Sequence, residues 1–254
     1  ARVLVDCGMV QGNDEALGPP DLERIEPRHL DAVVLTHAHL DHSGMLPWLA
    51  RKGYDGPIYC SRGTRDLCRI LWPDAARLQF EDDNPGPELY ELDDVWETIG
   101  RMRHLHYGEP QQLAPHVSVE LVRAGHIVGA CSVVLEVDGR RLLFSGDLGR
   151  SDDLLMLPPE PPPAADVVVV ESTYGDRSHP AVDPMALFAE HVGATLDRGG
   201  SVLIPAFAVG RAQLVLLMLS RLIAAGRLPE VPVFLDSPMA INASQLYCDH
   251  HRDH

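Results

Sequence analysis

The feature that most constrains the fold is a short apolar segment that runs directly into a cluster of metal-ligand side chains. Residues 32–35 have the length and β-branched content of a strand buried in a parallel sheet. Four potential ligands follow within six residues: His37, His39, Asp41 and His42. Residues 45–50 read as the start of a helix, so the loop is held by a regular element on each side. This stretch predicts an α/β fold with a site at the end of a strand.

The chemistry of these four side chains favours zinc. Imidazole nitrogen and carboxylate oxygen are both common zinc ligands, and their dense alternation suits two ions better than one. A solvated polar loop is the alternative interpretation. The pattern His-x-His-x-Asp-His directly after a strand favours the metal site.

Length and composition indicate a globular protein. With 254 residues the chain can bury a sizeable core, in one large domain or two modest ones. Its apolar runs are far too short to cross a bilayer, so we expect no membrane association. The five cysteines form no Cys-x-x-Cys pair, which favours a reducing compartment, and we expect a cytoplasmic location.

The net charge of -16 argues against a general, high-affinity binder of nucleic acid. Metal ions and a local group of Arg and Lys could still supply the positive field that a nuclease needs. If the chain acts on RNA, the acidic balance predicts binding in a local basic groove that weakens steeply with salt.

The remaining pattern predicts alternating strands and helices. Loops are expected at Gly18–Pro27 and Asp82–Pro87, where proline and glycine accumulate. An Asp-Gly turn at Asp138 predicts a hairpin of two strands. In chain order, we expect strands at 2–5, 58–60, 117–122, 131–137 and 140–144, and helices ending near 52 and 71 and spanning 95–102.

The last third of the chain has a different pattern. A proline-rich linker at 157–163 leads into residues 166–171, which we predict to be another buried strand. A helix at 184–196 follows. A strand at 202–204, a helix at 210–225 and a strand at 233–235 then make a βαβ unit typical of a parallel sheet. We place a domain boundary near 178–182, dividing the chain into domains 1–180 and 181–254.

Other ligand-type residues follow other predicted strands. In an α/β sheet the carboxyl ends of the strands converge on one edge. We therefore predict a two-zinc centre in which His37, His39 and His126 hold one ion. Asp41 and His42 would hold the second, Asp147 would bridge the two, and a hydroxide shared between the ions would be the nucleophile.

The residues outside the first loop have plainer interpretations as well. Asp6 can orient a ligand imidazole or simply cap a turn. His126 can be a satisfied histidine beside a glycine turn, and Asp147 a turn aspartate. Glu171 can be a surface residue or a helix cap.

These residues resemble the metallo-β-lactamase superfamily. Residues 37–42, His-Ala-His-Leu-Asp-His, match its signature, and Asp6, His126 and Asp147 fall where its other motifs fall. The segments Glu-Ser-Thr-Tyr-Gly at 171–175, the run from Gly200 to Gln213 and Asp-Ser-Pro-Met-Ala at 236–240 are similar to the β-CASP branch of RNA- and DNA-processing nucleases. The resemblance implies an αββα metallo-β-lactamase sandwich interrupted by a parallel α/β β-CASP domain, which is incomplete in these residues.

The resemblance also implies roles. It supports the six zinc ligands named above, and it makes Glu171 an acid that orients a histidine protonating the leaving group. That histidine, and a further ligand of the second zinc, follow the β-CASP domain in the family and lie outside these residues. His250, His251 and His254 lie too early to replace them. We expect Asp6, Asp41 and Glu171 to serve catalysis, and Arg211, at a helix start after a strand, to contact a substrate phosphate.

The leading hypothesis is a zinc-dependent nuclease of RNA processing or decay. It would cleave single-stranded RNA internally, and it could also act from the 5′ end; a homo-oligomer is compatible with the sequence. One alternative is an ester or thioester hydrolase of another metallo-β-lactamase branch, which the β-CASP-like segment disfavours. Another is a scaffold subunit of an RNA-processing complex with a decayed metal site.

Overall fold

The computed structural model describes residues 1–10, 22–79, 88–178, 181–251 and 253–254. The loop predicted at Asp82–Pro87 and residues 18–21 of the one predicted at Gly18–Pro27 lie outside the described residues, as does part of the predicted domain boundary. The chain forms two compact units. The first comprises Ala1–Glu171 with the terminal Asp253 and His254, and the second comprises Ser172–His251. The boundary near 178–182 stays a prediction.

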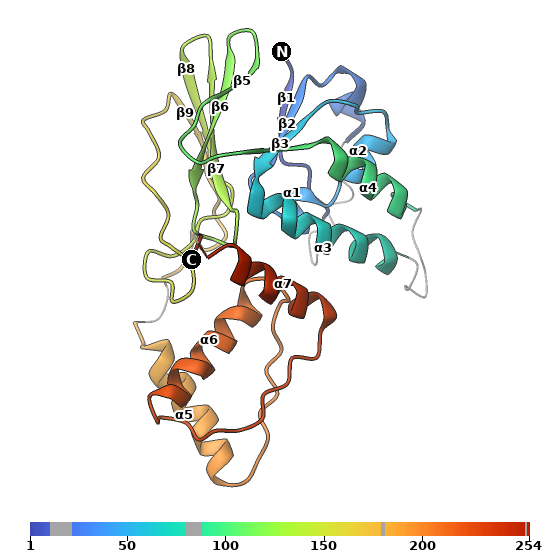
Figure 1. Cartoon of the computed structure of the whole chain (residues 1–254). Coiled ribbons are helices and arrows are strands. Elements are labelled where there is room, and N and C mark those ends of the chain that lie inside the picture. Colours follow the sequence, from blue (N-terminus) through green and yellow to red (C-terminus); the bar gives the residue numbers. More distant parts are fainter. Residues whose placement is uncertain (11–21, 80–87, 179–180, 252) are drawn as a thin grey trace. The chain divides into compact units, whose positions relative to one another are not determined.

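The first unit contains a four-stranded parallel sheet, here called the first sheet (Figure 1). Its strands follow the chain order: β1 (Val3–Val5), β2 (Ala32–Val34), β3 (Ile58–Ser61) and β4 (Met102–Leu105). Parallel strands need long crossover connections, which the helices between them supply. Residues 32–38 are all buried, so the predicted central strand is confirmed.

Helices cover one face of the first sheet (Figure 1). They are α1 (Leu40–Ser43), α2 (Leu46–Arg51), α3 (Arg62–Leu78) and α4 (Leu92–Arg101), and two short 3-10 helices, η2 (Leu22–Ile25) and η3 (Pro27–His29), precede β2. The predicted end of α3 near Leu71 is wrong, because the helix continues through Pro73. Its apolar face stays buried on both sides of the proline, at Trp72 and Ala76, and this packing outweighs the lost backbone hydrogen bond.

A second sheet of five strands is mainly antiparallel. It runs in the order β5 (Gln111–Ala114), β6 (Val117–Arg123), β7 (Cys131–Val137), β8 (Arg140–Phe144) and β9 (Val167–Val169). The β7–β8 hairpin turns at Asp138-Gly139, both at positive φ, as predicted. β9 pairs parallel to β8 at the edge of the sheet. The prediction that it is buried is wrong: its valines are 49–56% exposed, since an edge strand is covered on fewer sides.

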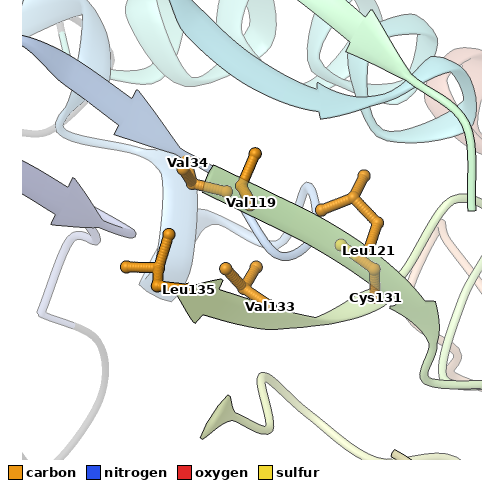
Figure 2. Packing of buried hydrophobic residues seen from close by; sticks show 6 residues of the cluster. All are labelled: Val34, Val119, Leu121, Cys131, Val133 and Leu135. Atoms are coloured by element: carbon orange, nitrogen blue, oxygen red, sulfur yellow. The ribbon is translucent and has the colours of Figure 1, made fainter. Parts of the chain in front are cut away.

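One hydrophobic core of the first unit lies between the two sheets. Val34 of the first sheet packs against alternate residues of the second sheet, which point to the same face (Figure 2). Those residues are Val119, Leu121, Cys131, Val133 and Leu135. The sandwich therefore holds the carboxyl ends of strands from both sheets in fixed positions.

The second unit contains three helices: α5 (Pro184–Asp197), α6 (Arg211–Ala224) and α7 (Pro238–Asp249). Val192 of α5 packs with Leu219 and Leu222 of α6. The buried amide of Gln213 on α6 donates to the carbonyl oxygens of Ala208 and Ala240, which ties α6 to α7.

The strands predicted at 202–204 and 233–235 do not form. Both segments run as extended chain without a strand assignment, and Leu203 and Phe234 are 93% and 88% exposed. A strand exists through hydrogen bonds to a neighbouring strand, and the described residues supply neither segment with one. No helix among the described residues has the length and apolar character needed to cross a membrane.

Candidate metal centre

The residues of the candidate centre come from the ends of strands in both sheets. The chain leaves β2 through the buried Thr36 and His37, and His39 immediately precedes α1. Asp41 and His42 lie on α1, so their positions are fixed by helical geometry. From the second sheet, His126 lies in the β6–β7 connection and Asp147 follows β8.

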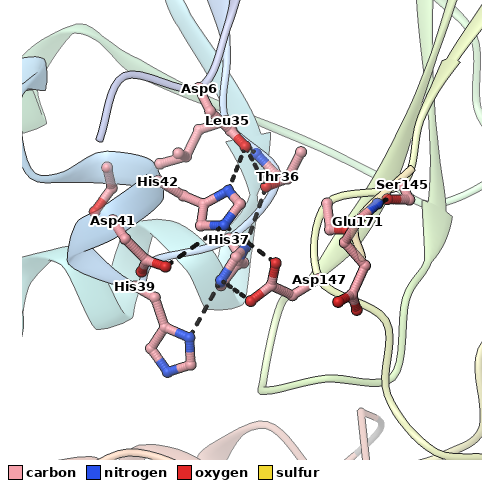
Figure 3. Close-up of polar contacts among 12 residues, drawn as sticks. Asp6, Leu35, Thr36, His37, His39, Asp41, His42, Ser145, Asp147 and Glu171 are labelled. Atoms are coloured by element: carbon pink, nitrogen blue, oxygen red, sulfur yellow. Dashed lines mark hydrogen bonds and ion pairs between the residues drawn. The ribbon is translucent and has the colours of Figure 1, made fainter. Parts of the chain in front are cut away.

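Three imidazoles and one carboxylate converge at a point, here called the three-histidine subsite: His37, His39, His126 and Asp147. Figure 3 shows His37, His39 and Asp147 of this group. The Nδ1 atom of His39 lies 3.2 Å from Nε2 of His37 and 3.1 Å from Nε2 of His126. Oδ2 of Asp147 lies 3.7 Å from Nε2 of His37 and 3.6 Å from Nε2 of His126.

A second group, here called the second subsite, shares the carboxylate of Asp147. Nε2 of His42 lies 3.1 Å from Oδ1 of Asp147 and 3.9 Å from Oδ2 of Asp41 (Figure 3). Asp147 thus presents one oxygen to each subsite. The Asp41 carboxylate is about half exposed, at 51%.

The spacing of these atoms fits a bound metal ion. A tetrahedral ion with nitrogen ligands at about 2.0–2.1 Å separates those nitrogens by about 3.3 Å. The two nitrogen separations of 3.1 and 3.2 Å are close to that value. The three-histidine subsite therefore has nitrogen spacing suited to one ion, and the second subsite offers two carboxylates and one imidazole to another.

The protonation of the three-histidine subsite also suits ligation. Burial is the main cause that lowers the pKa of His37 well below its ordinary value. Burial, with the neighbouring His126, lowers the pKa of His39 to about 4. Burial lowers the pKa of His126 as well, against the opposing charge of Asp147. These imidazoles are neutral at pH 7, and the neutral form is the one that binds metal.

In the second subsite, hydrogen bonds to carboxylates outweigh burial in setting the pKa of the histidine. Burial alone would lower the pKa of His42, but hydrogen bonds to Asp147 and Asp6 outweigh it and raise the pKa to about 10. Burial would raise the pKa of the Asp147 carboxyl, and the hydrogen bond with His42 reverses this and lowers it. The proton on Nε2 of His42 points to Asp147, on the side where the second subsite would hold a positive ion.

Asp6 lies behind the ligands. It follows β1 with φ of 60°, and its carboxylate accepts a hydrogen bond from Nδ1 of His42 at 2.7 Å (Figure 3). It also accepts from the backbone N–H and the hydroxyl of Thr36, each at 2.8 Å. Its position agrees with the predicted orienting role, which itself remains a prediction.

Glu171 contacts the loop that carries Asp147. Its Oε1 accepts a hydrogen bond from the backbone N–H of Leu148 at 2.9 Å. Its own N–H donates to Oγ of Ser145 at 3.0 Å (Figure 3). Its charge also acts on His126. The structure thus places Glu171 beside the centre, while its predicted effect on an acid histidine stays a prediction.

Two other predictions concern the second unit and the chain end. Arg211 lies in the first turn of α6 and is exposed, and its contact with phosphate stays a prediction. Neither ligand group found among the described residues includes His250, His251 or His254, and the expectation that they are not ligands stays a prediction.

Sequence reasoning missed the residues that support the ligand loops. The indole N–H of Trp72 on α3 donates to Oγ of Ser43, which in turn donates to the carbonyl of Ala38 inside the ligand loop. The hydroxyls of Ser61 and Thr64 both donate to the carbonyl of Gly129, in the loop that carries His126. Ser61 could be foreseen as the N-cap of α3, but its partner is 68 residues away. No local pattern indicates such a contact.

Comparison with known families agrees with this geometry. The model of the metallo-β-lactamase superfamily matches residues 1–184, which is more than two thirds of the chain, and that of the β-CASP domain matches residues 212–254. The chain belongs to the metallo-β-lactamase superfamily. Its fold is therefore that of a metallo-β-lactamase domain followed by the start of a β-CASP domain, as the sequence predicted.

The relatives that the chain resembles carry the names of ribonucleases and of a transcription termination factor. The chain is 45% identical over 249 residues to Ribonuclease TTHA0252 of Thermus thermophilus, covering 97% of this chain and 55% of the relative. It is 40% identical over 247 residues to Transcription termination factor FttA of Methanothermobacter thermautotrophicus (93% and 38%). It is 34% identical over 250 residues to an RNase J-like protein of Methanocaldococcus jannaschii (97% and 55%). The chain thus spans about half, or less, of the length of these relatives.

Proposed function

We propose that this protein is a zinc-dependent nuclease that cleaves phosphodiester bonds in single-stranded RNA. The observation that carries the proposal is the convergence of three imidazoles on one carboxylate, in a family with relatives named as ribonucleases. Two zinc ions would be held by the residues of the two subsites. A cytoplasmic location belongs to the same proposal.

The choice of zinc rests on the donor set. Imidazole nitrogens with carboxylate oxygens at tetrahedral spacing suit zinc better than magnesium or calcium, which prefer oxygen ligands. When bound, zinc supplies a water of pKa near 7 and polarises a phosphoryl oxygen. Metal analysis of the purified protein is the first test, because the proposal requires about two zinc ions per chain and a decayed site would hold fewer than one.

The residues of the chain have distinct tasks in this proposal. The two oxygens of Asp147 face different subsites, so this carboxylate would fix the spacing of the two ions. Asp6 would hold the ring of His42 through its Nδ1–H and leave Nε2 for the metal. Glu171 would hold the loop after β8 through Leu148, and so the position of Asp147.

The proposal also specifies the substrate as RNA. The relatives' names point to RNA, and the acidic balance of the chain requires that binding come from a local basic surface. Arg211 would contribute a phosphate contact there. Internal cleavage is proposed as the main mode, with action from the 5′ end as a further one.

The test is cleavage of a fluorescently labelled single-stranded RNA by the zinc-loaded protein. Asp147→Asn should lower the rate by at least about 100-fold, because it removes the oxygen charge that both subsites share. Asp152→Asn is a matched control in the same region, since that side chain is 69% exposed and pairs with Arg150. RNA left intact by zinc-loaded protein across metals and pH, with an activated ester cleaved instead, would refute the nuclease assignment in favour of the hydrolase alternative.

A further inference from the structure

The residue that joins the two subsites behind the ligands is Thr36. It is buried, at 1% exposure, between the end of β2 and the first histidine. Its hydroxyl lies 2.8 Å from Oδ2 of Asp6 and 3.1 Å from Nδ1 of His37 (Figure 3). Its backbone N–H donates to the other oxygen of the same carboxylate at 2.8 Å.

The hydrogen positions in this chain of contacts follow from donor counting. A carboxylate only accepts, and a threonine hydroxyl has a single hydrogen to donate. The hydroxyl hydrogen of Thr36 therefore points to Oδ2 of Asp6, and its oxygen is left to accept from Nδ1–H of His37. The opposite arrangement would set an oxygen lone pair of Thr36 against the carboxylate at hydrogen-bond distance.

The same carboxylate oxygen also fixes the second subsite. Oδ2 of Asp6 accepts from Nδ1–H of His42 at 2.7 Å. In both histidines a hydrogen is thus held on Nδ1, and Nε2 is the ring nitrogen that faces the metal position. Asp6 acts on His42 directly and on His37 only through Thr36.

We propose that Thr36 is a positioning residue that fixes the ring nitrogen of His37 available to metal and thereby couples the two subsites through Asp6. The inference rests on metal binding by the centre, which is part of the proposed function, and it is independent of the substrate. Removing the hydroxyl leaves Nδ1–H of a fully buried imidazole without its acceptor, so the other tautomer becomes accessible.

The test compares variants of the whole chain. Thr36→Val keeps the shape but removes the hydroxyl, and Thr36→Ser keeps the hydroxyl. Thr36→Ala removes the same group without adding volume, and it replaces the valine variant if that one does not fold. Thr98→Val is the matched control, because Thr98 is equally buried and its hydroxyl donates to the carbonyl of Asp94 within α4.

Two readouts are expected to agree. In metal-free protein, nitrogen-15 NMR of the imidazoles should find His37 protonated on Nδ1 in wild type and Thr36→Ser, and a shift to Nε2 protonation in Thr36→Val. Zinc affinity, from competition with a chromogenic chelator, should fall about 10–100-fold in Thr36→Val and stay within about threefold in Thr36→Ser and Thr98→Val.

The outcomes separate the two proposals. A Thr36→Val protein with the wild-type tautomer and wild-type zinc affinity overturns the role of Thr36. Wild-type protein that binds no zinc overturns the proposed function, and the tautomer measurement then decides the inference alone.

Discussion

Replacement of Gly8 by alanine tests how rigidly the second subsite is held. After β1 the chain runs against the backbone of α1, where the N–H of Cys7 donates to the carbonyl of His42 at 2.7 Å. A Cβ atom on Gly8 would overlap the carbonyl group of Asp41 and lie 2.8 Å from the backbone nitrogen of His42. The nearest atom, the carbonyl oxygen of Asp41, would lie only 1.5 Å from this Cβ. Optimal non-bonded separations are about 3.5 Å, so the two backbones must separate by roughly 2 Å.

The size of this movement sets the expected effects. Metal sites tolerate ligand displacements of about 0.2 Å, so zinc bound by Asp41 and His42 should weaken by at least about 100-fold. The overlap is between backbone atoms, which cannot rotate away, and it should cost about 3 kcal/mol of stability. The ligands from His37 and His126 lie outside α1, so one zinc should remain.

The assay is zinc stoichiometry by metal analysis after dialysis at limiting free zinc, together with urea unfolding. Wild type should retain about two ions and Gly8→Ala about one. Gly100→Ala on α4 is the matched control, because its Cβ meets no atom within 4 Å. This variant should keep about two zinc ions and should not lower the free energy of unfolding. Two tightly bound zinc ions in Gly8→Ala would refute the claim that close backbone contact fixes this subsite.

Three further predictions concern the first unit and the thiols. Burial raises the pKa of Cys7 to about 12, so alkylation of native protein at pH 8, followed by mass spectrometry, should modify the exposed Cys248 first; equal labelling of both would contradict this. Trp72→Phe loses the hydrogen bond to Ser43 and should lower the free energy of unfolding by about 1–3 kcal/mol in urea titrations. Burial lowers the pKa of His39 to about 4, so this imidazole binds its proton in the unfolded chain at a higher pH than in the folded protein. The free energy of unfolding of metal-free protein should therefore fall by up to about 3 kcal/mol between pH 6.5 and 4. A free energy of unfolding that does not change over this range would be inconsistent with a buried neutral imidazole.

Matched variants make these predictions specific. Trp96 is 49% exposed on α4, so Trp96→Phe should change stability by less than about 0.5 kcal/mol. A loss as large as that of Trp72→Phe would show that burial and the indole hydrogen bond are not the cause. For the acid titration, His39→Gln should flatten the profile between pH 6.5 and 4, because it removes one of the groups that titrate there.

The sequence predicted the strand ends well because their pattern is local. The buried run at 32–35 and the ligands after it occupy one short stretch. Because the carboxyl ends of strands converge in α/β folds, the sequence also predicted that His126 and Asp147 lie beside these ligands. The hairpin at Asp138 was predicted from its turn residues alone.

The failures concern properties that depend on distant neighbours. Val168 of β9 is as apolar as a core strand residue, yet it is exposed, since burial depends on what covers an edge. The apolar segment at 202–204 forms no strand because a ladder needs a partner. Thr36 carried no signal of its own either, because its hydroxyl acts through Asp6, 30 residues away.

The origin of the ligands in two sheets has a consequence for folding. His39 and His126 are 87 residues apart in the chain, and they belong to strand ends of different sheets. Their nitrogens can meet only after the two sheets have docked on the core around Val34. A metal ion bound between them stabilises the docked state over every state in which the sheets are apart, so part of its binding free energy becomes free energy of the sandwich itself. Chelation should therefore loosen the packing between the sheets before it unfolds either one.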